Sequence, residues 1–177
     1  MPKVSVCVPV YNVEKYIEKC VRSLFEQTLE DIEYIFVDDC SQDQSLNILH
    51  RVLTEYPQRQ NSVKIVRHKC NLNVSAAHQT AINIASGEYV IMCDSDDWVE
   101  PDMFSEMYQK ANEEIYVEDD LAQAIARQVV LDEDMLNHVS FHKYRVIKTP
   151  LSLLPGLTSK KKTKTIAFIM DGDKYHS

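Results

Sequence analysis

Two periodicities alternate along the first hundred residues, and this alternation limits the possible folds more than any other feature of the sequence. Short apolar runs predict strands, and recurrence of apolar residues every three or four positions predicts amphipathic helices between them. The predicted strands are 4–10, 34–37, 63–66 and 89–92, and the predicted helices lie within 14–27, 46–53 and 77–85. Near-continuous apolar strands separated by helices are typical of a mostly parallel sheet with helices on both faces. We therefore predict an α/β fold of the Rossmann type.

The composition describes one folded domain that lacks a glycine-rich phosphate loop. The chain has 177 residues, of which 45% are apolar and only three are glycine. This length and apolar content suffice for a buried core. Gly87, Gly156 and Gly172 are too far apart to form the G-x-G-x-x-G turn or the G-x-x-x-x-G-K-[ST] loop. Two of the commonest nucleotide sites are therefore excluded.

The charge balance limits the partners of the chain. Nineteen basic and 27 acidic residues give a net charge of −8, which argues against a general nucleic-acid binder. An anionic ligand therefore needs a bridging cation or a local basic group. Apolar runs are too short for a signal peptide or a membrane span, so we predict a cytoplasmic protein that associates with the inner face of a membrane at most peripherally. Five cysteines without a C-x-x-C pair predict reduced, mostly buried thiols.

Polar side chains follow the predicted strands, at the edge where ligands bind in parallel sheets. The first strand leads into Tyr11 and Asn12, the second into Asp38 and Asp39, the third into the segment 71–73, and the fourth into the segment 94–97. Aspartate and asparagine also form ordinary turns and cap helices, which is the alternative explanation for any single strand end. That explanation is much weaker for all of the strand ends together.

The strongest signal is the segment Asp94-Ser95-Asp96-Asp97. Three carboxylates so close together repel one another unless a cation lies between them, and Mg²⁺ or Mn²⁺ prefers such oxygen ligands. These ions usually keep several waters and leave room for substrate phosphates, so a diphosphate ligand fits the site. The alternative is an acidic turn without a metal.

Five motifs resemble those of the family 2 glycosyltransferases, which have the GT-A fold. They occur in the family's order and at its spacing over residues 1 to about 110. The motifs are 4–12 with Glu14, Tyr16 and Ile17 following, 23–28, 37–43, 85–90 and 94–98. The resemblance implies metal-assisted transfer of a sugar, with inversion, from a nucleotide-diphosphate sugar to a hydroxyl of a glycan or lipid-linked acceptor. UDP-sugars are the favoured donors. The resemblance places the protein in the synthesis of cell-surface polysaccharide or other glycans.

The resemblance also implies roles for individual residues. The residues implied to line the nucleotide base are Pro9, Tyr11 and Glu14. Asp39 would hydrogen-bond the base. Asp94 and Asp96 match the D-x-D motif, which contacts the ribose and holds the metal on the diphosphate, and Asp97 is a further candidate ligand.

An inverting transfer also needs a general base that takes the proton of the acceptor hydroxyl. In the family an E-D pair supplies it, and Glu118-Asp119 matches this pair literally. The segment 141–145 resembles the family's Y-x-Y-R motif, which follows the pair, and counting back from its Tyr144 favours Asp120. We rank Asp119 narrowly before Asp120. An acidic helix start, which suits the helix macrodipole, is the alternative for both residues.

Two departures distinguish this chain from the family pattern. In the family segment N-x-G-x-S-x-A-R-N, Asn73 replaces the glycine, His78 the arginine and Gln79 the last asparagine. Only about twenty residues separate Asp97 from Glu118, where the family usually has several dozen. The short interval indicates either a shortened acceptor half or the loss of a segment from the sequence, with an artificial junction at 110–117. The replacement of the arginine by His78 predicts weaker donor binding.

The sequence divides into three predicted parts. Residues 1–110 form the half that binds the nucleotide sugar, 111–158 form the shortened acceptor and catalytic-base segment, and 159–177 form a basic, weakly ordered tail. The second part contains a predicted helix at 121–136, a strand at 139–146 and a loop at Pro150.

Two alternatives to the transferase stay open. One is a catalytically impaired nucleotide-sugar-binding protein without a complete acceptor site. The other is a metal-dependent nucleotidyltransferase, which would need a basic triphosphate clamp that is not recognisable among these strands. The sequence leaves the oligomeric state open.

Overall fold

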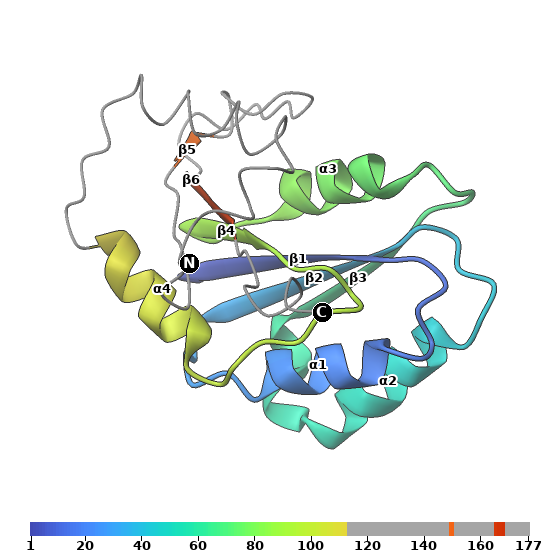
Figure 1. Cartoon of the computed structure of the whole chain (residues 1–177), viewed down its shortest axis with the longest axis horizontal. Coiled ribbons are helices and arrows are strands. Elements are labelled where there is room, and N and C mark those ends of the chain that lie inside the picture. The colour runs from blue at the N-terminus through green and yellow to red at the C-terminus, as the bar shows by residue number, and fades with distance from the viewer. Residues whose placement is uncertain (113–148, 151–164, 169–177) are drawn as a thin grey trace, which may run out of the picture.

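A computed structural model describes residues 1–112, 149–150 and 165–168 (Figure 1). These residues form a sheet with the strand order β3-β2-β1-β4-β6-β5. The strands are β1 (Val4–Val10), β2 (Ile32–Asp38), β3 (Val63–Arg67), β4 (Tyr89–Met92), β5 (Thr149–Pro150) and β6 (Thr165–Phe168). The helices are α1 (Ile17–Phe25), α2 (Ser45–Glu55), η1 (Pro57–Ser62, a 3₁₀-helix), α3 (Val74–Ile84) and α4 (Met103–Asn112).

The sheet is mostly parallel, as predicted. β1 pairs in parallel with β2 and β4, β2 with β3, and β4 with β6, whereas β5 and β6 are antiparallel. The chain runs outward from β1 through β2 to β3 and then returns to the other side of β1 as β4. The strand order therefore reverses between β1 and β4, and open α/β sheets bind ligands at the carboxyl ends of the strands at such a switch point.

Two apolar cores cover the two faces of the sheet, because side chains alternate along each strand. Val4, Val6, Val8 and Val10 of β1 pack in the core that α1, α2 and α4 share. Cys7 points to the other face and packs in the core that α3 completes. Figure 1 shows α3 on one side of the sheet and α1 and α2 on the other. The predicted arrangement of helices on both faces is therefore confirmed.

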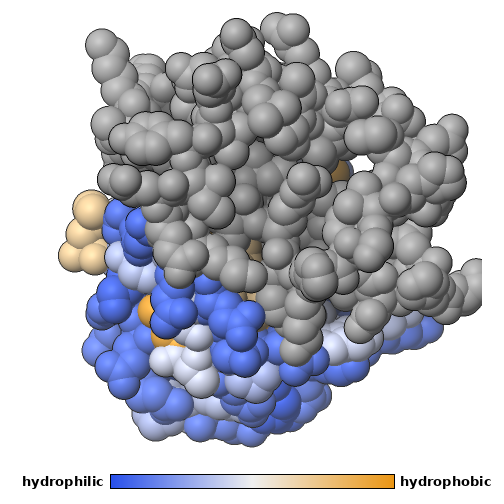
Figure 2. Space-filling model, turned by 60° about the vertical axis from the view of Figure 1, so that its left-hand side comes forward, coloured by the Kyte–Doolittle hydropathy of each residue, from blue (hydrophilic) through white to orange (hydrophobic). Residues whose placement is uncertain are grey.

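The surface of the described part is mainly hydrophilic on the face shown in Figure 2. Most large apolar side chains of the described part are buried in the two cores, and the exposed ones are Met1, Tyr11, Tyr16, Leu72, Val74, Ile84 and Trp98. Among the described residues, the longest helices have 11 residues, and none is long and apolar enough to cross a bilayer.

Three local features differ from the sequence-based expectations. The helix α4 was not predicted, although its buried residues Met103, Phe104, Met107 and Ala111 have helical spacing. The predicted loop at Pro150 is wrong, because Thr149–Pro150 pairs with β6 as the outer strand, where a proline is tolerated.

β6 lies within the segment 159–177, for which the sequence predicts a weakly ordered tail. Its residues pair with β4 and are an exception to that expectation, since threonine and isoleucine favour strands. The helix expected at 121–136 and the strand expected at 139–146 lie outside the described residues. The division into three parts remains a prediction.

Candidate functional site

An open cleft lies where β1, β2 and β4 end. Its volume is about 390 Å³, and it extends from the strand ends to the first turn of α3. It is lined by Pro9, Val10, Tyr11, Val13, Asp39, Asn71, Asn73, Val74, Ala77, Asp94, Ser95 and Asp96. Five of the residues that the sequence singled out therefore come together here: Pro9, Tyr11, Asp39, Asp94 and Asp96.

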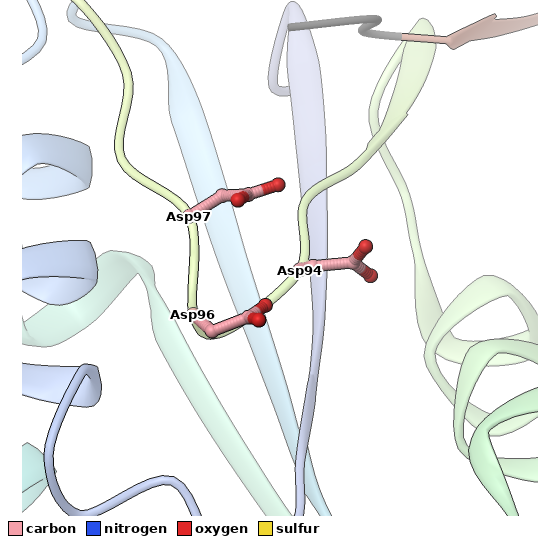
Figure 3. Close-up of side chains that lie close together, drawn as sticks. All are labelled: Asp94, Asp96 and Asp97. Atoms are coloured by element: carbon pink, nitrogen blue, oxygen red, sulfur yellow. The ribbon is translucent and has the colours of Figure 1, made fainter. Parts of the chain in front are cut away.

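Three carboxylates form one cluster at the rim of this cleft. Asp94, Asp96 and Asp97 each offer an oxygen atom, and these atoms lie within 4.8 Å of one another. Figure 3 shows all three side chains on the turn that follows β4, with their carboxylates close together. Oxygen ligands on opposite sides of Mg²⁺ are about 4.2 Å apart, because each lies about 2.1 Å from the ion. The cluster therefore fits one hard divalent cation after small side-chain movements.

The turn that carries the cluster is anchored to β1 and α1. Cys93 N donates to Cys7 O at 3.0 Å, which continues the pairing with β1, and Asp97 N donates to Asp94 O at 3.2 Å. The Sγ atoms of Cys20 and Cys93 lie 3.7 and 3.6 Å from Asp94 O. A hydrogen bond with Cys20 and burial raise the pKa of Cys93, so its thiol is a neutral donor. These contacts fix the backbone from which the carboxylates project.

Asp39 follows β2 and holds its carboxylate in a fixed position beside the cleft. Its side chain is 4% exposed. Leu72 N donates to Oδ1 at 2.9 Å and to Oδ2 at 3.1 Å, and His68 Nδ1 lies 2.7 Å from Oδ1. The neighbouring Asp38 has another role, because its buried carboxylate accepts from Ser41 N and pairs with Arg67. Asp38 therefore shapes the turn, and Asp39 faces the cleft.

The end of β1 contributes an aromatic wall. Tyr11 is 47% exposed and lines the cleft beside Pro9. Glu14 is not among the lining residues, since its Oε2 accepts from Gln44 N at 3.0 Å beside the start of α2. The carboxylate of Glu14 thus holds the loop after β1 against α2.

The first turn of α3 forms the opposite side of the cleft. Asn73 adopts a positive φ of 76°, and its side chain caps the helix by accepting from Ala76 N at 3.1 Å. The turn in which asparagine replaces glycine is therefore formed. Asn71 belongs to the segment 71–73, which the sequence analysis places at the end of the third predicted strand. Val74 and Ala77 were not assigned to the site, because apolar residues of a helix give no sign that they line a cleft.

His78 lies one turn further along α3. Its Nε2 atom is buried and makes no hydrogen bond with the residues that the structure describes. Burial lowers the pKa of His78, and the charge of Asp94 acts in the opposite direction. The imidazole is therefore mainly neutral at pH 7, unlike the arginine that the family pattern has at this position.

The predicted general bases do not belong to the described part of the chain. Asp119 and Asp120 both lie in the segment 113–148. Their catalytic role is therefore a prediction from the sequence alone.

The mostly parallel sheet and the cleft at its switch point assign the chain to the α/β proteins that bind ligands at the ends of their strands. A family model described as "Glycosyl transferase family 2" matches residues 5–155, and the chain belongs to this family. The resemblance of its motifs to this family is therefore confirmed.

Curated relatives are similar over part of their length. The chain is 41% identical over 113 residues to "Putative glycosyltransferase EpsH" of Bacillus subtilis, a match that covers 64% of the chain and 31% of that protein. It is 40% identical over 113 residues to a "Poly(ribitol-phosphate) beta-glucosyltransferase" of Bacillus spizizenii, covering 63% of the chain and 17% of that protein. The chain thus spans about a third or less of these relatives.

Solved structures confirm the predicted GT-A fold. TarS 1–349 of S. aureus in complex with UDP-GlcNAc is 32% identical with a TM-score of 0.57, over 63% of the chain and 31% of TarS. The mannosyltransferase PcManGT of Pyrobaculum calidifontis in complex with GDP-Man and Mn²⁺ is 26% identical with a TM-score of 0.59, over 64% of the chain and 33% of the enzyme.

Proposed function

We propose that the described residues bind the donor of an inverting glycosyltransferase. The donor is a nucleotide-diphosphate sugar, with a UDP-sugar favoured, and the acceptor is a hydroxyl of a glycan or of a lipid-linked glycan in polysaccharide synthesis. One observation carries the proposal: three carboxylates meet within 4.8 Å at the rim of a cleft that Asp39 also lines. The similar structures with UDP-GlcNAc, and with GDP-Man and Mn²⁺, support both the donor class and the cation.

In this proposal, different carboxylates bind different parts of the donor. Asp96 holds Mg²⁺ or Mn²⁺ together with Asp94 and Asp97, and Asp94 also contacts the ribose. A bound cation supplies stabilisation of the negative charge that develops on the leaving diphosphate. At the other end of the cleft, Asp39 accepts a hydrogen bond from the base, and Tyr11 and Pro9 lie beside it. Glu14 contributes indirectly, by holding the loop that carries Tyr11.

Transfer with inversion needs a base on the acceptor side. Asp119, or Asp120 in its place, takes the proton of the acceptor hydroxyl while the hydroxyl oxygen attacks the anomeric carbon. The bond from that carbon to the diphosphate breaks, and its electron pair leaves with the nucleoside diphosphate. Because the hydroxyl attacks from the opposite face, the configuration of the anomeric carbon is inverted. The cytoplasmic location and the peripheral contact with a membrane belong to the same proposal.

The test compares an aspartate of the cluster with an aspartate outside the cleft. Asp96→Asn keeps the size of the side chain but removes a charged ligand, and we expect at least a tenfold loss of Mn²⁺-dependent UDP affinity in calorimetry. Asp102→Asn is the matched control, because Asp102 is exposed and does not line the cleft. Donor hydrolysis and transfer are measured on the same variants. Unchanged metal-dependent binding in Asp96→Asn would refute the metal assignment.

A second candidate function is donor binding without transfer. It is favoured by the short interval between Asp97 and Glu118, which has about twenty residues where the family usually has several dozen. Tight, metal-dependent UDP binding without turnover on any acceptor would support this second function, and turnover that Asp119→Asn or Asp120→Asn abolishes would support the transferase.

A further inference from the structure

A buried histidine contacts the carboxylate of Asp39, which hydrogen-bonds the nucleobase in the proposed function. His68 directly follows β3, and its Nδ1 atom lies 2.7 Å from Asp39 Oδ1. The side chains are 9% and 4% exposed, respectively. On the other side of the ring, Nε2 lies 2.9 Å from Thr80 Oγ1 in α3. The imidazole therefore bridges the end of β2 and the helix α3.

The partners of the ring determine its protonation pattern. An ionised carboxylate only accepts hydrogen bonds, so Nδ1 must carry a proton and donate it to Asp39. In the neutral imidazole Nε2 then lacks a proton and accepts from the hydroxyl of Thr80. Thr80 thus orients the ring, and the ring orients the carboxylate.

The two carboxylate oxygens of Asp39 accept different numbers of hydrogen bonds. Oδ1 accepts from His68 and from Leu72 N, whereas Oδ2 accepts only from the shared amide of Leu72, at 3.1 Å. Each carboxylate oxygen has room for about two donors. Among the described residues, Oδ2 is therefore the oxygen with unused acceptor capacity, and Asp39 lines the cleft.

We propose that His68 is a positioning residue that turns Asp39 Oδ2 toward the N–H group of a nucleobase, such as the imide of uracil. This inference rests on the proposed function, in which Asp39 contacts the base. His68 acts through Asp39 and touches neither the diphosphate nor the cation. Its loss should therefore weaken recognition of the base and leave recognition of the diphosphate unchanged.

Two substitutions of His68 test the contacts of the two ring nitrogens separately. The amide nitrogen of asparagine is as many bonds from Cβ as Nδ1, so His68→Asn keeps a donor for Asp39. The amide of glutamine reaches the position of Nε2, so His68→Gln keeps the contact with Thr80 but loses that donor. His50→Gln is the matched control, because His50 is an exposed residue of α2. Thermal melting of each variant checks that the full chain is folded.

Calorimetry with two ligands in the presence of Mn²⁺ measures the effect. For UDP, we expect His68→Gln to lose about tenfold in affinity and His68→Asn to stay within about threefold of the wild type. For inorganic pyrophosphate, which has no base, all variants should bind within about twofold of the wild type. In an Asp39→Asn background, His68→Gln should have no further effect on UDP binding.

Each alternative result has its own meaning. An equal loss for UDP and pyrophosphate would show that His68 only supports the fold, and undiminished UDP binding by His68→Gln would likewise overturn its positioning role. If Asp39→Asn bound UDP like the wild type, the assignment of Asp39 to the base would fail, and the inference with it. If the wild type bound neither UDP nor GDP in the presence of Mn²⁺, the proposed function itself would fail.

Discussion

Replacing Glu33 by glutamine tests how the sheet holds a buried charge. Glu33 lies in β2, and its side chain is 5% exposed. Oε1 accepts from Ser5 Oγ at 2.5 Å, from Gly87 N at 3.0 Å and from both the amide and the hydroxyl of Ser86. Lys64 Nζ donates to Oε2 at 2.7 Å. One carboxylate thus joins β1, β2 and β3 to the loop before β4.

The expected magnitude follows from the pKa of this carboxyl group. Burial acts to raise the pKa of Glu33, but the hydrogen bonds from Lys64, Ser5 and Ser86 outweigh it and lower the pKa from 4.5 to about 2. This difference corresponds to about 3 kcal/mol of folding free energy. Because the pKa is lowered in the folded state, the stabilisation is complete above pH 4.5 and is lost as the pH falls toward 2.

Urea unfolding followed by circular dichroism provides the assay. At pH 7 we expect Glu33→Gln to lower the free energy of unfolding by about 3 kcal/mol, and between pH 4.5 and 2 the difference from the wild type should shrink. Glu30→Gln is the control, because Glu30 is exposed. A loss below about 1 kcal/mol at pH 7, or a difference that does not depend on pH, would refute the reasoning.

Three further substitutions test the fold around the strands by the same unfolding assay. Gly87→Ala should cost roughly 1–3 kcal/mol, because its Cβ would lie 2.7 Å from Ser5 N; an unchanged stability would contradict this close approach. Tyr34→Phe should cost about 1 kcal/mol, since the buried hydroxyl donates to Leu24 O at 2.6 Å, and a neutral effect would argue against that hydrogen bond. Cys40→Gly should raise the stability by up to about 1 kcal/mol, because Cys40 has a φ of 68°, whereas a loss would show that its side chain matters more than its backbone.

The strands and most helices could be predicted because their side chains meet uniform surroundings. Val4, Val6, Val8 and Val10 face one buried core and Cys7 faces the other, so nearly all positions of β1 are apolar. The helix α4 has the same apolar spacing but was not predicted, and it follows directly after the acidic turn. Pro150 shows the reverse case, because only the position of β5 at the sheet edge makes a proline acceptable there.

The members of the candidate site that directly follow a strand could be predicted from the sequence. Asp39, Asp94 and Tyr11 follow strands that run parallel, so their convergence needs only the order of the strands. His68 needs the register as well: Asp38 pairs with Arg67, which places the residues that follow them, Asp39 and His68, side by side. The direction of Glu14 depends on how α2 packs, which no local pattern in the sequence reveals.

Because the chain has few glycines, other residues adopt the left-handed backbone conformation in the loops at the cleft. Among the described residues, the non-glycine residues with positive φ are Asn12, Cys40 and Asn73, and each lies in a loop next to a cleft-lining residue or lines the cleft itself. Such conformations cost about 1–3 kcal/mol for a side chain with Cβ, although asparagine tolerates them better. The hydrogen bonds of the loops offset this cost: Gln42 N donates to Asn12 Oδ1, and Ala76 N to Asn73 Oδ1. The side chains of Asn12 and Asn73 thus stabilise the turns in which their own backbones are strained. Glycine would avoid the strain but has no side chain to form these hydrogen bonds.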